Sequence, residues 1–131
     1  MIVDSSALVS IIYGETDSIP FSMQLDSADT LRISAATFLE TSVVVDARKS
    51  PVLSNRVEDL IERFNIVIEP VTAEQARIAR QAYRDYGKGS GHRANLNFGD
   101  CFAYALARVK REPLLYKGDD FVHTDLRSAM S

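Results

Sequence analysis

Several acidic side chains in this sequence occupy positions where the neighbouring residues are apolar. Asp4 ends the first apolar run, Asp100 opens a nearly uncharged run, and Glu40 has no charged neighbour for at least five positions on either side. Asp119 and Asp120 follow another short apolar run. Their settings make these five acids the candidates for a common site.

In one crevice these carboxylates would repel one another and raise one another's pKa, unless they shared a cation. Mg²⁺ and Mn²⁺ suit such a cluster, since both are hard ions that bind oxygen ligands, and Mg²⁺ retains several waters beside a few carboxylates. One or two such metals can lower the pKa of a bound water and stabilise in-line displacement at a phosphodiester. The residue types therefore indicate metal-dependent phosphodiester hydrolysis, without choosing between RNA and DNA.

Short strands and one helix are expected to position these acids. Residues 1–3 read as a buried strand that ends at Asp4, and residues 113–116 read as the strand before the pair of acids. Asp100 is expected in the first turn of a helix, where the helix dipole favours a carboxylate, and an ordinary helix cap is its alternative role. Because sites in open parallel sheets form beyond the carboxyl ends of the strands, we expect the acids to converge there.

Strands and helices alternate along the rest of the chain. Further strands are predicted at 31–34 and 65–69, and helices over 7–13, 16–27, 35–49, 54–64 and 72–86. The helix that carries Glu40 is expected to be otherwise buried. This order predicts a single domain over residues 1–131, an α/β three-layer fold with a short central parallel sheet of about four or five strands flanked by helices.

The composition excludes several classes of protein. The chain is 46% hydrophobic and 25% charged, as in ordinary globular domains, and its one cysteine excludes an internal disulfide and a cysteine-based zinc cluster. We expect that cysteine, Cys101, to be a small buried residue and not a nucleophile. No segment resembles a signal peptide or is long enough to span a membrane, which leads us to expect a cytoplasmic protein with no membrane partner.

Positive charge is concentrated in one segment of a chain whose net charge is -3. That net charge argues against holding nucleic acid by charge alone, but acids that bind a metal ion are compatible with it. Between residues 77 and 93 five cations stand against one acid, and Lys88 and Arg93 lie in a glycine-rich loop that leads toward Asp100. Lys88 and Arg93 are therefore candidate phosphate contacts, and a solvated surface is the alternative.

Four segments, in this order, resemble the PIN-domain ribonucleases, and in particular the VapC toxins of bacterial toxin–antitoxin pairs. They are residues 2–8, 38–40, 97–101 and 114–121. The resemblance covers essentially the whole chain, and the order and spacing of the segments make it more specific than any one of them. It implies a Mg²⁺-dependent endoribonuclease toxin in which a metal-activated water cleaves structured RNA, most often tRNA.

The resemblance also implies roles for individual acids. Asp4 and Asp100 would bind Mg²⁺ most directly, with Mn²⁺ as a substitute. Glu40 would complete the cluster, either as a ligand or as the base that positions the attacking water. The last acid corresponds best to Asp120, with Asp119 as the alternative, because the family varies at the position of Asp119.

Ser6 matches the family's hydroxyl residue that supports the first aspartate. The same resemblance implies a homodimer and an inhibitory VapB-type antitoxin, whose basic side chain enters the acidic pocket. None of these partners follows from the composition or the periodicity of the sequence.

Three other functions compete with this interpretation. Aspartyl-nucleophile phosphatases also carry an aspartate after the first strand, but they need a second aspartate two residues later, where this chain has Ser6. A PIN-type nuclease of RNA processing or decay would share the acids without the antitoxin. A non-catalytic nucleic-acid-binding module would be expected to lack one or more of the four acids, and all four are present.

Overall fold

The computed structural model describes residues 1–130, in which helices and strands alternate as the sequence predicts. The strands are β1 (Ile2–Val3), β2 (Arg32–Ser34), β3 (Val67–Glu69) and β4 (Leu114–Leu115). The helices are α1 (Ser5–Ile12), α2 (Ser18–Ser27), α3 (Ala35–Asp46), α4 (Pro51–Arg63), α5 (Ala73–Tyr86) and α6 (Asp100–Lys110). Within the described part of the chain, no helix is long and apolar enough to cross a membrane.

The four strands form one parallel sheet in the order β3-β2-β1-β4. Ile2 in β1 lies opposite Arg32 in β2 on one side and Leu114 in β4 on the other. The chain therefore builds the sheet outward from β1 in one direction and returns to place β4 on the other side. In parallel sheets this change of direction opens a crevice at the carboxyl ends of the strands, here between β1 and β4.

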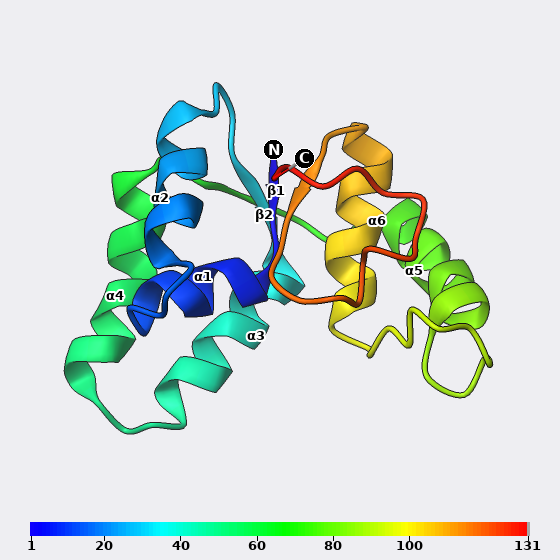
Figure 1. Cartoon of the computed structure of the whole chain (residues 1–131), viewed down its shortest axis with the longest axis horizontal. Coiled ribbons are helices and arrows are strands. Elements are labelled where there is room, and N and C mark those ends of the chain that lie inside the picture. Colours follow the sequence, from blue (N-terminus) through cyan, green and yellow to red (C-terminus); the bar gives the residue numbers. More distant parts are fainter. Residues whose placement is uncertain (131) are drawn as a thin grey trace.

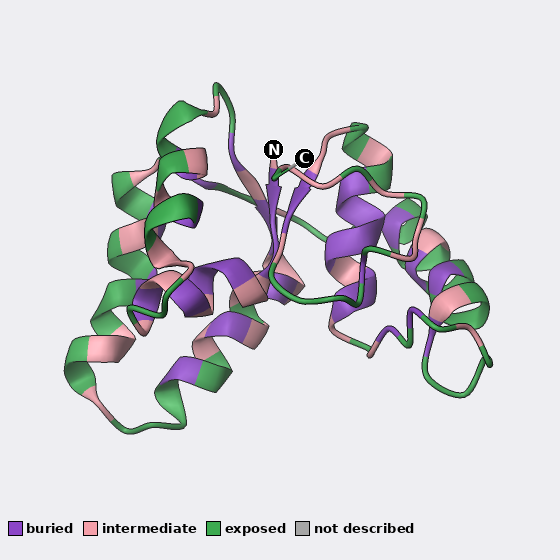
Figure 2. Ribbon diagram, viewed as in Figure 1, coloured by how far each residue is buried: buried purple, intermediate pink, exposed green. Residues whose placement is uncertain are grey.

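The sheet is covered on both faces, which confirms the predicted three-layer α/β fold. Successive side chains of a strand point to opposite faces. Ile2 and Leu114 pack in one apolar cluster with α5 and α6, whereas Val3, Ile33 and Leu115 pack in another with α1, α2 and α4. Figure 1 shows these two groups of helices on either side of the strands, and Figure 2 shows the buried residues of α6 and the strands at the centre.

Helix α3 departs from the prediction that it is buried. Its side chains Thr37, Thr41 and Val45 face the interior, but Leu39 and Val43 are 62% and 60% exposed. A helix in contact with α1, α4 and α6 on one side only can carry apolar residues on its open face. Exposed apolar side chains that gather on one face mark a candidate surface for a partner.

The boundary between α3 and α4 also lies earlier than the sequence suggested. Ser50 and Pro51 were expected to end the helix that carries Glu40, but they begin the next one. The Ser50 hydroxyl accepts a hydrogen bond from the backbone amide of Leu53 at 3.3 Å, and Pro51 occupies the first helical turn. Proline is favoured there because the amide it lacks has no partner within the helix.

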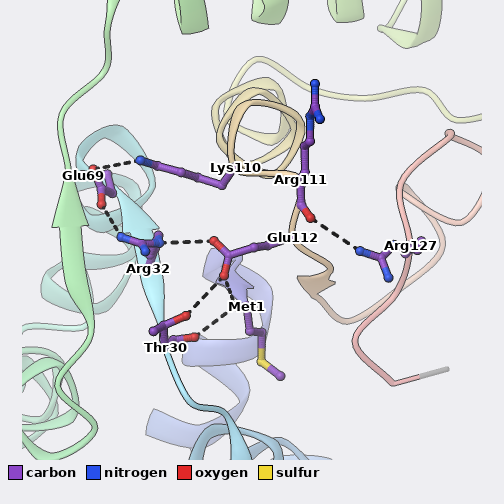
Figure 3. Close-up of polar contacts among 8 residues, drawn as sticks. All are labelled: Met1, Thr30, Arg32, Glu69, Lys110, Arg111, Glu112 and Arg127. Atoms are coloured by element: carbon purple, nitrogen blue, oxygen red, sulfur yellow. Dashed lines mark hydrogen bonds and ion pairs between the residues drawn. The ribbon is translucent and has the colours of Figure 1, made fainter.

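Ion pairs hold together the side of the sheet where β1, β2 and β4 begin (Figure 3). Arg32 contacts Glu69 through Nη1 at 2.8 Å and Glu112 through Nε at 3.2 Å. Glu112 also pairs with the amino group of Met1 at 2.7 Å. Burial opposes ionisation of Glu112, but the hydrogen bonds and charges of Met1 and Arg32 outweigh it and lower the pKa of Glu112. The carboxyl ends of β1 and β4, on the opposite side, are left for the acids.

Candidate active site

Asp4 stands at the carboxyl end of β1 and is the N-cap of α1. Its side chain is only 2% exposed, and Oδ2 accepts hydrogen bonds from the backbone amide of Ser6 at 3.1 Å and from the Ser6 hydroxyl at 2.6 Å. Oδ1 is also buried, yet no group among residues 1–130 donates to it. A buried carboxylate oxygen without a donor is costly, so an ion or a water is expected to bind there.

The Ser6 hydroxyl connects Asp4 to the loop that follows β4. It donates to Asp4 and accepts a hydrogen bond from the backbone amide of Lys117 at 2.9 Å. Because a hydroxyl has a single proton, the two contacts fix its direction toward Asp4. The chain just before Asp119 and Asp120 is thereby anchored at the end of β1.

Asp100 occupies the first turn of α6, as predicted, and is 8% exposed. Its Oδ2 accepts a hydrogen bond from the backbone amide of Asn97 at 3.0 Å, while Oδ1 of Asn97 accepts one from the backbone amide of Asp100 at 2.8 Å. This reciprocal pair has the pattern of a capping box, in which two side chains satisfy each other's free amides at the start of a helix. The hydrogen bonds thus tie Asp100 to the turn that precedes α6, whose N-cap is Gly99.

Glu40 on α3 reaches the start of α6, where its carboxylate lies against Gly99. A Cβ atom on residue 99 would occupy the position of the Glu40 carboxylate. The backbone of Gly99 is helical, with φ -63° and ψ -38°, so space and not conformation requires glycine here. The contact places Glu40 next to the residue that precedes Asp100.

Burial and the charges of neighbouring acids act together on Asp4 and Asp100. Burial raises the pKa of Asp4 to about 6 despite the hydrogen bonds from Ser6, and the charge of Glu40 adds to the increase. Burial likewise raises the pKa of Asp100 to about 7, with further contributions from the charges of Asp4, Asp120 and Glu40. The fold thus brings the four predicted acids into one electrostatic cluster.

The two acids after β4 differ in their relation to this cluster. Both side chains are exposed. The charge of Asp120 contributes to the raised pKa of Asp100, whereas Asp119 is not among the neighbours that contribute most. The charge of Asp120 thus acts on Asp100, and the choice of Asp120 over Asp119 as the fourth acid stays a prediction.

The residues present fit a divalent cation that is bound by few protein ligands. Within residues 1–130, no three acidic, histidine or cysteine side chains stand close enough together to hold a metal by themselves. Mg²⁺, however, is often bound through one or two carboxylates while it keeps several waters. The unpartnered Oδ1 of Asp4, beside the charge of Asp100, provides oxygen ligands of this kind.

The predicted phosphate contacts lie on the surface of the loop before α6. Lys88 and Arg93 are exposed on the loop between α5 and α6. Backbone hydrogen bonds of 2.9 Å from Lys88 to Leu96 and from Leu96 to Tyr86 close this loop. Across the described residues, no ion pair engages either cation.

Two residues near the acids have other roles. Cys101 is buried, and burial raises the pKa of its thiol to about 11, so it is a packed side chain and not a thiolate nucleophile. Asp125 accepts a hydrogen bond from the Tyr104 hydroxyl at 2.7 Å and pairs with Arg108. These contacts account for the position of the Asp125 side chain, so no part in the acidic cluster is needed to explain it.

Sequence reasoning missed Asn97 and Gly99, which hold two of the acids in place. The signal for Asn97 was present: an asparagine three residues before an acid, ahead of an apolar run, is the pattern of a capping box. Nothing in the sequence indicated that Gly99 contacts Glu40, since the two residues are far apart in the chain.

A family model described as the PIN domain matches residues 1–126. The chain is 52% identical over 130 residues to the VapC ribonuclease Mb0625 of Mycobacterium bovis and to ribonuclease VapC28 of Mycobacterium tuberculosis, with 99% of this chain and 98% of each relative covered. Ribonuclease VapC42 of Mycobacterium tuberculosis is 48% identical over 129 residues, with 98% of both chains covered.

Solved structures share the fold at lower identity. VapC20 of Mycobacterium tuberculosis, a sarcin-ricin-loop-cleaving toxin, matches with a TM-score of 0.74 at 17% identity and 95% coverage of both chains. A chain of a toxin–antitoxin complex from Klebsiella pneumoniae matches with a TM-score of 0.69 at 16% identity, over 92% of this chain and 88% of that one. These similarities support the same arrangement of sheet and helices.

Proposed function

This chain belongs to the PIN-domain family and is a ribonuclease of the VapC type, and we propose that it cleaves structured RNA as a Mg²⁺-dependent toxin that an antitoxin inhibits. One observation carries the proposal: Asp4 and Asp100 are both buried at the carboxyl ends of the strands, and one oxygen of Asp4 has no partner. Without a cation this arrangement costs stability, because buried like charges lack compensation.

In the proposed mechanism Asp4 and Asp100 hold the ion, and Glu40 and Asp120 complete the acidic site. Mg²⁺, when bound, would lower the pKa of a water and stabilise negative charge at the phosphodiester. Mn²⁺ is expected to replace Mg²⁺ in this role. We assign to Glu40 the role of the base, since its half-buried carboxylate is more accessible than the two buried aspartates. One of its oxygens would take a proton from the attacking water.

The proposed substrate is structured RNA, with tRNA as the first candidate. Lys88 and Arg93 are proposed to contact phosphates, which is supported by their exposure and by a loop that leads into the Asn97 turn. Neutralising either residue should weaken RNA binding and lower the slope of affinity against salt by about one. An unchanged slope would remove that role.

The proposed antitoxin is a VapB-type protein that inserts an arginine or lysine among the acids. The cluster suits such a contact, because a charge-assisted hydrogen bond to a buried carboxylate is strong. The Klebsiella pneumoniae chain of the same fold comes from a toxin–antitoxin complex, which supports a partner of this kind. A homodimer is proposed as well, with support from the exposed apolar side chains Leu39 and Val43 on α3 and Phe98, which is 74% exposed, before α6.

We also propose that residues 1–131 form a single domain, supported by the family match over residues 1–126 and by one sheet that both apolar clusters share. A second domain would need a core of its own.

The function is tested by incubating the purified protein with total RNA, with Mg²⁺, with EDTA and in parallel with Asp100→Asn. We expect discrete fragments that disappear with EDTA and with the variant, and end mapping would identify the RNA. The panel includes tRNA and ribosomal RNA, since a structural neighbour cleaves the sarcin-ricin loop. Tight RNA binding without cleavage by a metal-loaded, antitoxin-free protein would instead support a non-catalytic binding module.

If cleavage occurs, a separate observation distinguishes a toxin from an RNA-processing nuclease. If a small reading frame adjoins the gene, co-expression with its product should restore growth and inhibit cleavage in the case of a toxin. Cleavage that no such product inhibits would favour the processing nuclease.

A further inference from the structure

We propose that Asn97 is a positioning residue for Asp100: its two hydrogen bonds fix the orientation of the Asp100 carboxylate and the place of the α6 N-terminus in the acidic site. The inference rests on the proposed function, because it concerns how that site is held ready for a cation. Asn97 acts through its hydrogen bonds to Asp100 and through the turn that it begins, and we assign it no contact with the reacting atoms.

Asn97 and Asp100 hold each other in place by two reciprocal hydrogen bonds. Asn97 Oδ1 accepts from the Asp100 amide at 2.8 Å, which fixes the backbone, and Asp100 Oδ2 accepts from the Asn97 amide at 3.0 Å, which fixes the side chain. Of the Asp100 carboxylate, only Oδ2 receives a hydrogen bond from the described residues. The turn therefore occupies one oxygen and leaves Oδ1 for a ligand.

Repulsion from the neighbouring acids acts against this orientation of the Asp100 carboxylate. The charges of Asp4, Asp120 and Glu40 all bear on Asp100. A carboxylate free to rotate would turn away from three like charges toward water. Since Asp100 is only 8% exposed, the Asn97 turn must hold it against that repulsion before a cation binds.

Glu40 of α3 contacts Gly99, which lies in the same turn as Asn97 and Asp100. The Glu40 carboxylate lies where a Cβ of residue 99 would be, so the path of residues 97–100 sets the separation between Glu40 and Asp100. Loss of the Asn97 side chain would let this turn shift, which would change the positions of two acids together.

The chain offers a matched control for the capping contribution alone. Thr72 caps α5, and its hydroxyl accepts a hydrogen bond from the backbone amide of Gln75 at 3.1 Å. Thr72→Ala removes one side-chain acceptor at the start of a helix, as Asn97→Ala does, but at a helix that carries none of the four acids. If the loss of any helix cap weakened Mn²⁺ binding, Thr72→Ala and Asn97→Ala would both show weaker binding.

The experiment measures Mn²⁺ binding to the antitoxin-free protein by calorimetry, without RNA, in wild type, Asn97→Ala, Asn97→Gly, Asn97→Ser and Thr72→Ala. Asn97→Ala and Asn97→Gly both keep the backbone amide that donates to Asp100 Oδ2 but remove the side-chain oxygen that accepts from the Asp100 amide, so the turn should shift. Mn²⁺ should therefore bind about 10- to 100-fold more weakly to these two variants, as is usual when a residue that orients a ligand is removed. Asn97→Ser, which keeps an acceptor at the cap, should recover most of the affinity, and Thr72→Ala should match wild type. Glycine costs little at a cap, so Asn97→Gly answers the question if Asn97→Ala fails to fold.

Cleavage kinetics provide a second readout. In Asn97→Ala, kcat should fall by a similar factor at limiting metal while KM for RNA stays unchanged, because the RNA-contacting surface is intact. Wild-type Mn²⁺ affinity in both Asn97→Ala and Asn97→Gly, or an equal loss in Thr72→Ala, would overturn the inference. If wild type itself bound no Mn²⁺, the metal site of the proposed function would fail instead, so the two failures are distinguishable.

Discussion

Asp4 and Asp100 combine burial with negative charge, and each depends on a nearby residue of its own segment. Ser6 donates two hydrogen bonds to Asp4, and Asn97 exchanges two with Asp100. These contacts favour the charged carboxylates, but burial outweighs them and raises both pKa values. Residues kept in such a costly state are typical of functional sites.

Replacing Asp100 with asparagine should separate activity from stability. Asp100→Asn keeps an oxygen that can accept from the Asn97 amide but removes a metal ligand, so cleavage should fall by about 100-fold or more. Without metal, the free energy of unfolding at pH 8 should rise by on the order of 2 kcal/mol, because a buried charge is removed. Asp46→Asn, at the exposed last residue of α3, is the control. It should change neither the cleavage rate nor the free energy of unfolding appreciably. Full activity of Asp100→Asn would contradict the proposed site.

The stability of the metal-free protein should fall as the pH rises from 5 to 8. Asp4 and Asp100 have pKa values of about 6 and about 7 in the fold, against 3.8 as the ordinary value, so the folded state binds more protons than the unfolded chain between these limits. Their stabilising contribution is complete below the ordinary pKa and is lost as the pH passes through the raised values, at up to about 1.4 kcal/mol per unit and group.

Thermal unfolding across this pH range, with and without Mg²⁺, tests that sign. Mg²⁺ should offset the loss, because it favours the ionised carboxylates. The lowered pKa of Glu112 places its titration below this window, so Glu112 does not contribute. Metal-free stability that rose between pH 5 and 8 would contradict the assignment of both raised pKa values.

At the scale of elements, the site is assembled from the ends of helices and not from any one motif. Asp4 and Asp100 stand at the N-termini of α1 and α6, where free amides and the helix dipole favour carboxylates. Glu40 comes from the middle of α3. The contact of α3 with the start of α6 is therefore what brings the third acid to the other two.

The contact between Glu40 and Gly99 can be tested with a single methyl group. Gly99→Ala suits the helical backbone, so folding stability should be unchanged or higher, but its Cβ would displace the Glu40 carboxylate. Cleavage should fall about 10-fold or more, within the range seen when a catalytic group is misplaced. In the background of Glu40→Ala, Gly99→Ala should cause no further loss. Equal losses in both backgrounds would show that the effect does not pass through Glu40.

The sequence could predict the elements and the acids at their ends, because apolar runs and capping residues are local signals. Asp4 after a strand and Asp100 at the start of a helix were found in this way, and the family resemblance supported Glu40. The exposed face of α3 could not be predicted, because helix periodicity does not tell which apolar residues find a neighbour. Nor could the position of Glu40 against Gly99, which depends on how two distant helices meet.

At the scale of the whole molecule, the two ends of the strands carry different groups of charged residues. Ion pairs around Arg32 and Glu112 close the side where β1, β2 and β4 begin (Figure 3). Asp4 and Asp100 lie where the strands end, and one oxygen of Asp4 has no partner there. The apolar clusters on both faces hold these ends in register. The exposed apolar side chains Leu39 and Val43 lie on α3, the helix that also carries Glu40, and form a candidate surface for a partner.

Val43→Asp should weaken the proposed homodimer. Val43 is 60% exposed, so the substitution should leave the monomer folded, but it would place a charge in an apolar interface. Light scattering after size exclusion should show a dimer for wild type and a shift toward monomer for Val43→Asp. Val52→Asp, at a position on α4 that is 64% exposed, is the matched control and should remain dimeric. A monomeric wild type would contradict the homodimer, and an unchanged Val43→Asp dimer would place its interface elsewhere.

The most direct test of the central claim is an anomalous difference map from a crystal soaked in Mn²⁺. Asp4, directly after β1, and Asp100, at the start of α6, are proposed to bind one metal ion. The map should show a peak within about 2.0–2.4 Å of Asp4 Oδ1 and bound to Asp100 directly or through water. The peak should be absent in Asp100→Asn or strongly reduced. A well-diffracting, antitoxin-free crystal with Mn²⁺ only at other positions, or with none, would contradict the claim.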